Sequence, residues 1–340
     1  MKNIAFIFLI VTVFFLGFFP GCAKNNETTV ILGSYTATRE AYIAIIPLFQ
    51  EYWYKKTGKT VRVKQSYLGS GAQSRAIAGG FEADIAALSL ESDVESIAKA
   101  GLIKHDWKSL PHRGMITNSV VVLAVREGNP KKILDWVDIT KSGLAILTPN
   151  PKSSGGAMWN VLAVYGAAKR GKVLGYDSND EGARKFLKDV FKNVTVLDKG
   201  ARESIINFEK GIGDVLITYE NEMLAGRKQG QSYEEIMPSS TILIENPVAV
   251  VDQYAEKHGV KEVAEAFRDF LWTKKAQKVF SDFGFRLVDP EVAGETSSQF
   301  PSVPDLWKAE FLGDWKQLIP NFFGPSGVFT KIMEEIQREK

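Results

Sequence analysis

The sequence predicts an α/β protein of two lobes, each with a central, mostly parallel sheet flanked by helices, and a ligand cleft between the lobes. Short apolar runs alternate along the chain with stretches of helical periodicity. The length of 340 residues suits two lobes of ordinary size. Small and polar residues follow several of the apolar runs, where the carboxyl ends of parallel strands lie.

The first group of elements begins with an apolar run at 30–35, which predicts a buried strand. Tyr42, Ile45, Phe49 and Trp53 then fall on one face of a helix. Further strands are predicted at 61–66 and 83–88, with a short helix from about Gln73 between them. Because strands and helices alternate, we expect parallel pairing with right-handed crossovers.

The second group begins with the strand predicted at 120–125 and includes the strands predicted at 144–147, 194–197 and 214–217. A strand at 248–251 and a helix carrying Val263 and Phe267 follow. We therefore predict that residues 30–115 and 250–340 form one lobe and residues 116–249 the other. The aromatic stretch 301–340 is interpreted as a tail packed across the surface.

The pattern of the N-terminal residues predicts an export signal. A basic start precedes an almost wholly apolar stretch at 4–20, which is followed by Cys22, the one cysteine of the chain. We predict a signal peptide at 1–21 and a lipidated tether at 22–29, because Cys22 lies where a bacterial lipobox would place it, although Phe19 and Pro20 depart from that motif. The alternatives are an uncleaved membrane helix and an ordinary signal with an incidental cysteine. The protein is expected in the periplasm or on the outer face of the cytoplasmic membrane.

Composition and motifs argue against several classes of protein. A net charge of +2 without a dense basic run gives no indication of nucleic-acid binding. No cluster has metal-ligand spacing and no motif indicates a cofactor, so neither is expected. Ser154 would need a base to act as a nucleophile, yet His105, His112 and His258 lie in no catalytic motif. An enzyme, such as a serine hydrolase, is therefore not expected.

Four turns that follow predicted strands concentrate small and polar residues. They are 34–38, 69–71, 153–156 and 200–201. A helix start presents unpaired N–H groups and a partial positive charge, and glycine lets the backbone approach a ligand closely. Each turn alone is an ordinary cap or turn. Together, they predict an anion site.

Five motifs in order carry a resemblance to a known family. They are SYTATRE at 34–40, QSYLGSG at 65–71, TPNPKSSGGAMWN at 148–160, VLDKGAR at 196–202 and GIGDVLITYENE at 211–222. With them, the chain resembles the periplasmic sulfate- and thiosulfate-binding proteins of ABC transporters, which have the type II periplasmic-binding-protein fold. The resemblance implies that the chain delivers sulfate, possibly thiosulfate, to a membrane permease, and that it works as a monomer.

The same resemblance implies the residues of the site. Backbone N–H groups of Thr36, Ser70, Gly155, Gly156 and Ala201 would contact the anion, together with the hydroxyl of Ser154. Tyr219 would supply a side-chain donor where family members carry tryptophan. A tyrosine hydroxyl can also accept, so it could tolerate a protonated or larger ligand.

A shell of donors favours sulfate over phosphate, because hydrogen phosphate would leave its own O–H unpaired, at a cost of about 1–3 kcal/mol. Asp198 and Glu220 are interpreted as structural residues, with Arg202 or Lys152 as candidate partners, and Arg39 and Arg75 as solvated charges. Molybdate or tungstate binding on the same fold is the alternative function. An anion-sensing interaction protein is a further one.

Overall fold

The computed structural model describes residues 27–339, and its strands join in one sheet. The strands are β1 Thr28–Tyr35, β2 Val61–Leu68, β3 Ile85–Ala87, β4 Met115–Val125, β5 Ile146–Pro149, β6 Val194–Asp198, β7 Val215–Tyr219, β8 Glu234–Ile236, β9 Thr241–Val250, β10 Arg286–Leu287 and β11 Leu306–Trp307. The α-helices are α1 Arg39–Thr57, α2 Ser70–Ala78, α3 Glu91–Lys99, α4 Gly155–Lys169, α5 Asp180–Lys192, α6 Ala201–Glu209, α7 Glu220–Lys228, α8 Asp252–Lys257, α9 Lys261–Phe270, α10 Lys274–Asp282, α11 Pro290–Thr296, α12 Trp315–Leu318 and α13 Val328–Glu339. Shorter helical turns are η1 Thr36–Thr38, η2 Trp107–Ser109, η3 Pro111–Gly114, η4 Trp136–Thr140, η5 Ser297–Gln299, η6 Ala309–Phe311 and η7 Ile319–Phe323.

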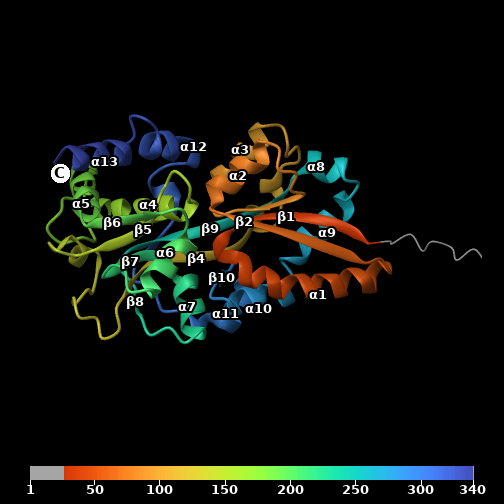
Figure 1. Ribbon diagram of the computed structural model, residues 1–340, viewed down its shortest axis with the longest axis horizontal. Helices are drawn as coiled ribbons and strands as arrows, with labels where there is room; N and C mark the ends of the chain where they lie inside the picture. The colour runs from red at the N-terminus through yellow and green to blue at the C-terminus, as the bar shows by residue number, and fades with distance from the viewer. Residues whose placement is uncertain (1–26, 340) are drawn as a thin grey trace, which may run out of the picture.

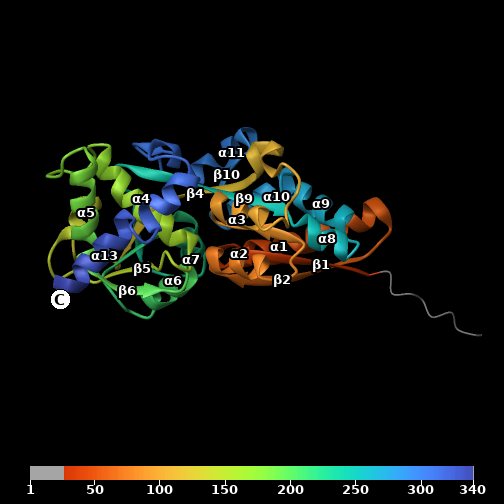
Figure 2. The same ribbon diagram turned by 90° about the horizontal axis from the view of Figure 1, so that it is seen from above.

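The strand order is β2-β1-β3-β9-β4-β7-β5-β6. β1 pairs in parallel with β2 and β3, and β5 pairs in parallel with β6 and β7. The long strands β4 and β9 are antiparallel to each other and to the strands beside them, β7 and β3. Figures 1 and 2 show β4 and β9 running between two halves of the molecule. This mixed α/β sheet flanked by helices confirms the predicted fold class.

Buried apolar faces hold the helices on the sheet. Tyr42, Ile45, Phe49 and Trp53 of α1 are buried, as the helical spacing predicted. Phe49 packs edge-on against Phe267 of α9 with ring centroids 4.9 Å apart. In contrast, α4 is buried on nearly all sides, because the sheet, α5 and aromatic side chains of the C-terminal segment cover it. The helix predicted from about Gln73 begins at Ser70.

The C-terminal segment contacts a different part of the molecule from the one expected. Residues 301–340 were assigned with 30–115, yet α13 packs on α5 (Figure 1), and aromatic side chains of α12 and η7 pack on α4. Trp315 packs edge-on against Trp159 at 4.8 Å, and Phe329 against Phe191 at 5.0 Å. The boundary is therefore wrong for this segment, because its aromatic side chains are buried against helices of the 116–249 region.

The predicted tether is also corrected at its end. Residues 22–29 were expected outside the fold, but Thr28 and Thr29 begin β1 and pair with Val61 and Arg62. The predicted signal peptide and Cys22 lie outside the described residues. Throughout residues 27–339, every helix is too short or too polar to cross a membrane.

Candidate functional site

Four helices begin just beyond parallel strands without a side-chain cap. They are α2, α4, α6 and α7, whose N-caps are Gly69, Ser154, Gly200 and Tyr219. The short turn η1 likewise follows β1 without one. Neither α2 nor α4 has an acidic residue in its first turn. The N–H groups at these starts are thus left for another acceptor, and anions are the ligands that they attract.

Three of the turns approach one another so closely that glycine is required. A Cβ atom on Gly69 would lie 2.5 Å from the carbonyl oxygen of Ser153 and 3.2 Å from that of Lys199. A Cβ atom on Gly155 would lie 3.2 Å from Cβ of Ser70. In addition, the hydroxyl of Ser153 donates to the carbonyl of Lys199 at 2.8 Å. The starts of α2, α4 and α6 therefore meet at one place.

Two hydroxyl groups meet at the start of α4. The position that a Cβ atom on Gly156 would take is 3.3 Å from both the Ser154 Oγ and the Tyr219 hydroxyl oxygen. Both side chains are buried. Burial raises the pKa of Tyr219 well above its usual value, so this hydroxyl keeps its proton at any physiological pH. The site therefore presents neutral donors to a ligand.

Thr36 and Ala201 lie on the other side of the same turns. The half-buried Thr36 has its Oγ1 3.7 Å from the position that a Cβ on Gly200 would take, and α6 packs against η1. The structure thus brings all of the sequence-predicted residues to neighbouring helix starts: Thr36, Ser70, Ser154, Gly155, Gly156, Ala201 and Tyr219. Their role as ligand contacts stays a prediction.

A buried polar network behind Ser70 was not predicted. The Ser70 hydroxyl donates to Asp93 at 2.5 Å and accepts from the N–H of Ser89 at 2.9 Å. Burial raises the pKa of Asp93 to about 6, against the opposing effects of the Ser70 hydrogen bond and Arg75. Ser89 Oγ lies 2.8 Å from the Tyr219 hydroxyl. No local pattern indicates these contacts, because they join residues from separate elements.

The carboxylates near the motifs have structural partners, as predicted, but not the predicted ones. Glu220 forms a bidentate pair with Arg286, with bonds of 2.6 and 2.8 Å. Asp198 accepts from Ser204 and Asn207 rather than from Arg202 or Lys152.

Arg202 instead pairs with two other glutamates. It lies 2.8 Å from Glu40 and 3.4 Å from Glu222. Burial raises the pKa of Glu222 to about 7, opposed by Arg202, and neither oxygen of this carboxylate has a hydrogen-bond partner in the described structure.

Two of the three histidines serve as partners of other carboxylates. His105 Nδ1 lies 2.7 Å from Asp252, and His258 lies 2.7 Å from Asp84 and 2.8 Å from Glu82. Within residues 27–339, Ser154 has no hydrogen bond to a histidine.

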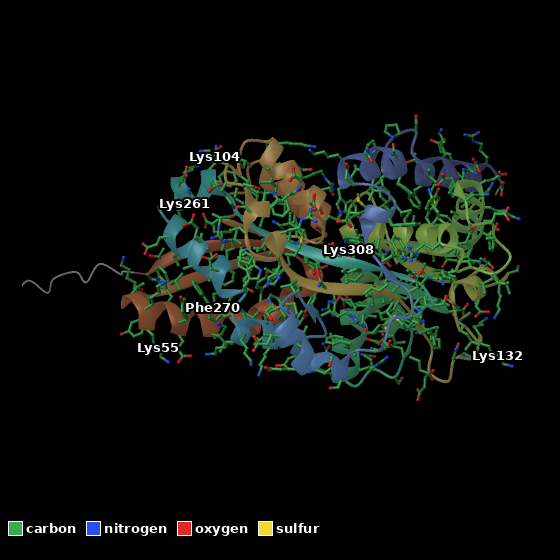
Figure 3. All side chains as sticks on the ribbon, turned by 180° about the vertical axis from the view of Figure 1, so that it is seen from behind. Lys55, Lys104, Lys132, Lys261, Phe270 and Lys308 are labelled. Carbon is green, nitrogen blue, oxygen red and sulfur yellow. The ribbon has the colours of Figure 1, made fainter. Side chains whose placement is uncertain are left out.

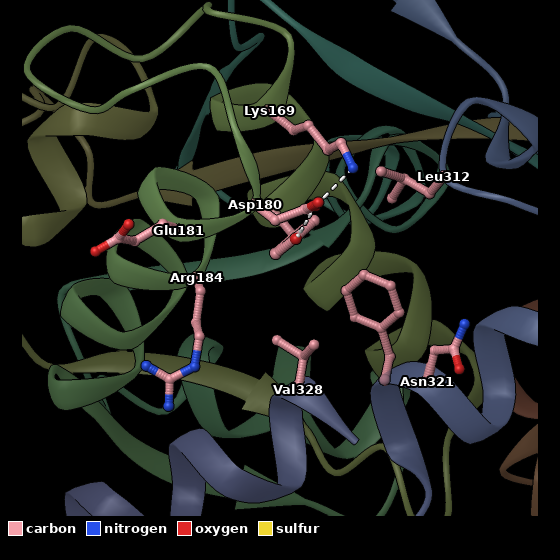
Figure 4. Close-up of a pocket in the computed structure, with 9 residues that line it drawn as sticks. Lys169, Asp180, Glu181, Arg184, Leu312, Asn321 and Val328 are labelled. Carbon is pink, nitrogen blue, oxygen red and sulfur yellow. Dashed lines mark hydrogen bonds and ion pairs between the residues drawn. The ribbon is translucent and has the colours of Figure 1, made fainter. Parts of the chain in front are cut away.

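Other surface features lie away from these turns. A pocket of about 460 Å³ opens between α4, α5 and the C-terminal segment, and Figure 4 shows Lys169 and Asp180 paired on its wall, 2.6 Å apart. Its charged residues are of both signs. Lysines are spread over the surface, with Lys55 and Lys132 at opposite ends of the molecule (Figure 3). Neither feature concentrates positive charge at one place.

Known proteins match this chain over most of its length. Residues 31–286 match the family model of the bacterial extracellular solute-binding proteins. The sulfate-binding protein of Synechococcus elongatus is 45% identical over 326 residues, covering 93% of this chain and 92% of the relative. The thiosulfate-binding protein of Pseudomonas aeruginosa is 34% identical over 317 residues, covering 92% and 94%.

A solved structure of a sulfate-binding protein also matches this chain. The sulfate-binding protein SubI of Mycobacterium tuberculosis superimposes with a TM-score of 0.80 at 37% identity, over 87% of this chain and 99% of that one. Solved structures at 14–16% identity, among them a binding protein from Actinobacillus pleuropneumoniae with a TM-score of 0.59, share the fold alone. The described site lies within the matched region, and the chain belongs to the bacterial extracellular solute-binding proteins.

Proposed function

We propose that this protein captures sulfate for an ABC importer. The observation that carries the proposal is the meeting of uncapped helix starts around the buried hydroxyls of Ser154 and Tyr219. Such a site offers donors and no carboxylate acceptor from the predicted contact residues. Sulfate is fully ionised at neutral pH and offers acceptors alone, so this chemistry matches it, and the names of the relatives point the same way.

The ligand would be held between the two groups of elements. Backbone N–H groups of Thr36, Ser70, Gly155, Gly156 and Ala201 replace its hydration shell, and the hydroxyls of Ser154 and Tyr219 complete it. Closure of the two lobes about β4 and β9 encloses the anion, a ligand-driven hinge movement of the usual kind. The closed monomer then docks on the permease, which releases the anion for transport.

Calorimetric titration tests the proposal. A chain that begins at Lys24, and so lacks Cys22, is titrated with sulfate, thiosulfate, molybdate, tungstate and phosphate in a buffer free of oxyanions. We expect one-to-one sulfate binding and a phosphate affinity at least tenfold lower, which corresponds to about 1.4 kcal/mol. A response to molybdate or tungstate without one to sulfate would overturn the proposed cargo. Thiosulfate is the second candidate, because two relatives of 34 and 35% identity carry that name.

The family is extracellular, and we further propose that the protein is held at the membrane by lipid on Cys22. The motif position of this cysteine after an apolar stretch supports the anchor. Expressed in a bacterium, the wild-type chain should fractionate with membranes, and Cys22→Ala should appear in the soluble exported fraction. Continued membrane association of Cys22→Ala would point to an uncleaved helix instead.

A further inference from the structure

Ser89 is fixed in place by three other elements. It lies between β3 and α3 and is buried. Its N–H donates to Ser70 Oγ of α2 at 2.9 Å, and its carbonyl accepts from Trp159 Nε1 of α4 at 2.9 Å. Asn246 of β9 donates to the same carbonyl at 3.3 Å. The backbone of Ser89 has little freedom, and its side chain is therefore held in one place.

That side chain meets the Tyr219 hydroxyl. The two oxygens are 2.8 Å apart, and within residues 27–339 neither has another hydrogen-bond partner. A hydroxyl carries one proton and must place it on an acceptor, or a buried donor is left unpaired. If Tyr219 donates to Ser89, the Ser89 proton is left without a protein acceptor in the described structure, and if Ser89 donates to Tyr219, the tyrosine proton is left without one. The position of the oxygens separates the two orders, because the Tyr219 oxygen faces the start of α4.

The direction left free for the Tyr219 proton leads to the start of α4. The Tyr219 oxygen is 3.3 Å from the position that a Cβ on Gly156 would occupy, and Ser154 Oγ is equally close to that point. A proton directed there reaches an anion bound at Gly155 and Gly156. When Ser89 donates to Tyr219 and Tyr219 donates to the ligand, both hydroxyl protons have an acceptor. This requires a ligand that offers acceptors alone.

We propose that Ser89 is a positioning residue that aims the Tyr219 proton at the bound anion. The Tyr219 hydroxyl, which can accept or donate a hydrogen bond, then acts as a donor to the anion. The inference rests on the proposed function and deepens it, because it makes the ligand at this point an acceptor-only oxyanion. Ser89 belongs to the predicted 30–115 lobe, whereas Tyr219 and Trp159 belong to the 116–249 lobe. The donor is therefore aimed when the lobes close.

The test is a double-mutant cycle on Ser89→Ala and Tyr219→Phe, read as sulfate affinity and dissociation rate. We expect Ser89→Ala to weaken sulfate binding about tenfold, mainly through faster dissociation, because the contact forms on closure. Tyr219→Phe should weaken it at least as much. In the Tyr219→Phe background, Ser89→Ala should add less than about a twofold change, since Ser89 acts through the tyrosine. Equal, additive losses in both backgrounds would overturn the inference.

Ser92→Ala is the matched control. Ser92 follows Ser89 closely in sequence, and its buried hydroxyl has no partner in the described structure, so its loss should leave sulfate affinity within about twofold. Thermal unfolding without ligand shows whether each variant folds. If Ser89→Ala does not fold, Ser89→Thr keeps the hydroxyl and should bind within about threefold of wild type; a tenfold loss in folded Ser89→Thr would count against the inference.

Failure of this inference is distinguishable from failure of the proposed function. If the wild-type protein binds none of the tetrahedral oxyanions, the proposed function fails and the inference fails with it. If the wild type binds sulfate and Ser89→Ala binds it equally well, the inference alone fails.

Discussion

The guanidinium of Arg202 lies 2.8 Å from the carboxylate of Glu40, joining the start of α6 to the start of α1. Arg202 follows the predicted contact residue Ala201, and Glu40 lies four positions after Thr36. The pair therefore ties together the turns that carry Thr36 and Ala201. The same guanidinium is 3.4 Å from the fully buried Glu222, so it also offsets the charge of that carboxylate.

Glu40→Gln should loosen the closed form without unfolding the protein. A partly exposed ion pair contributes roughly 0.5–1 kcal/mol, so we expect sulfate to dissociate about two- to fivefold faster. Stopped-flow displacement measures this rate. Glu51→Gln is the control, because Glu51 pairs with Lys55 on the same helix but on an exposed surface. An unchanged rate in Glu40→Gln would show that the pair does not hold the lobes.

Arg202→Ala should behave differently, because it leaves Glu222 buried without its cation. Removing one partner of a buried pair costs about 3–5 kcal/mol in general, and this pair is partly solvated, so we expect the lower part of that range in the free energy of unfolding. Chemical denaturation at pH 8 measures the loss. Near pH 6 the loss should be smaller, since a carboxyl with a pKa of about 7 is then mostly neutral. An equal loss at both pH values would contradict this account.

Ser154→Ala tests the hydroxyl donor at the start of α4. Loss of a hydrogen bond to a charged ligand should weaken sulfate binding by about 1.5–3 kcal/mol, measured by calorimetry. Ser153→Ala is its neighbour and control, because the Ser153 hydroxyl donates to the carbonyl of Lys199 instead. Equal affinities for Ser154→Ala and the wild type would remove this hydroxyl from the site.

Gly69→Ala tests the close approach of the turns. Gly69 has φ −58° and ψ 140°, which alanine adopts freely, so the effect is steric rather than conformational. Its new methyl group would lie 2.5 Å from the carbonyl oxygen of Ser153 and force the turns apart. We expect at least a tenfold loss of sulfate affinity with a small change in thermal stability. Gly294→Ala, where a Cβ meets open space, is the control.

Asp93 should make sulfate binding depend on pH. Its carboxyl is buried below Ser70, and the groups that face it are Ser70, Arg75 and the Tyr219 hydroxyl. The ionised form, dominant above a pKa of about 6, repels a nearby anion. Affinity measured from pH 5 to 8 should therefore fall as the pH rises through about 6. Asp93→Asn, which keeps an acceptor for Ser70, should remove most of this dependence.

The same carboxyl affects the free energy of unfolding. Its pKa is raised from 3.8 in the unfolded chain to about 6 in the folded one, so between these values the folded state binds more protons. Stability therefore falls as the pH rises through this window, by at most about 3 kcal/mol from this group. Denaturation of the wild type and of Asp93→Asn at pH 4 and pH 7 measures the difference. A wild-type curve parallel to that of Asp93→Asn would contradict the assignment.

The sequence by itself determined many of the local elements and the turns that precede several helices. The strands predicted at 30–35 and 61–66 became β1 and β2, and they pair in parallel, as the alternation of strand and helix patterns predicted. Gly69, Ser154 and Gly200 were recognisable as turn residues, because glycine and hydroxyl side chains at a helix start act locally.

Only the tertiary structure decided which residues meet across separate elements. Ser89 reaches Tyr219 across 130 positions, and Glu40 reaches Arg202 across 162. The aromatic side chains of the last helices pack on α4 and α5 rather than on the lobe formed by residues 30–115, where the sequence placed them. Such contacts depend on burial and shape that no short pattern encodes, since their free energy comes from side chains brought together by the whole fold.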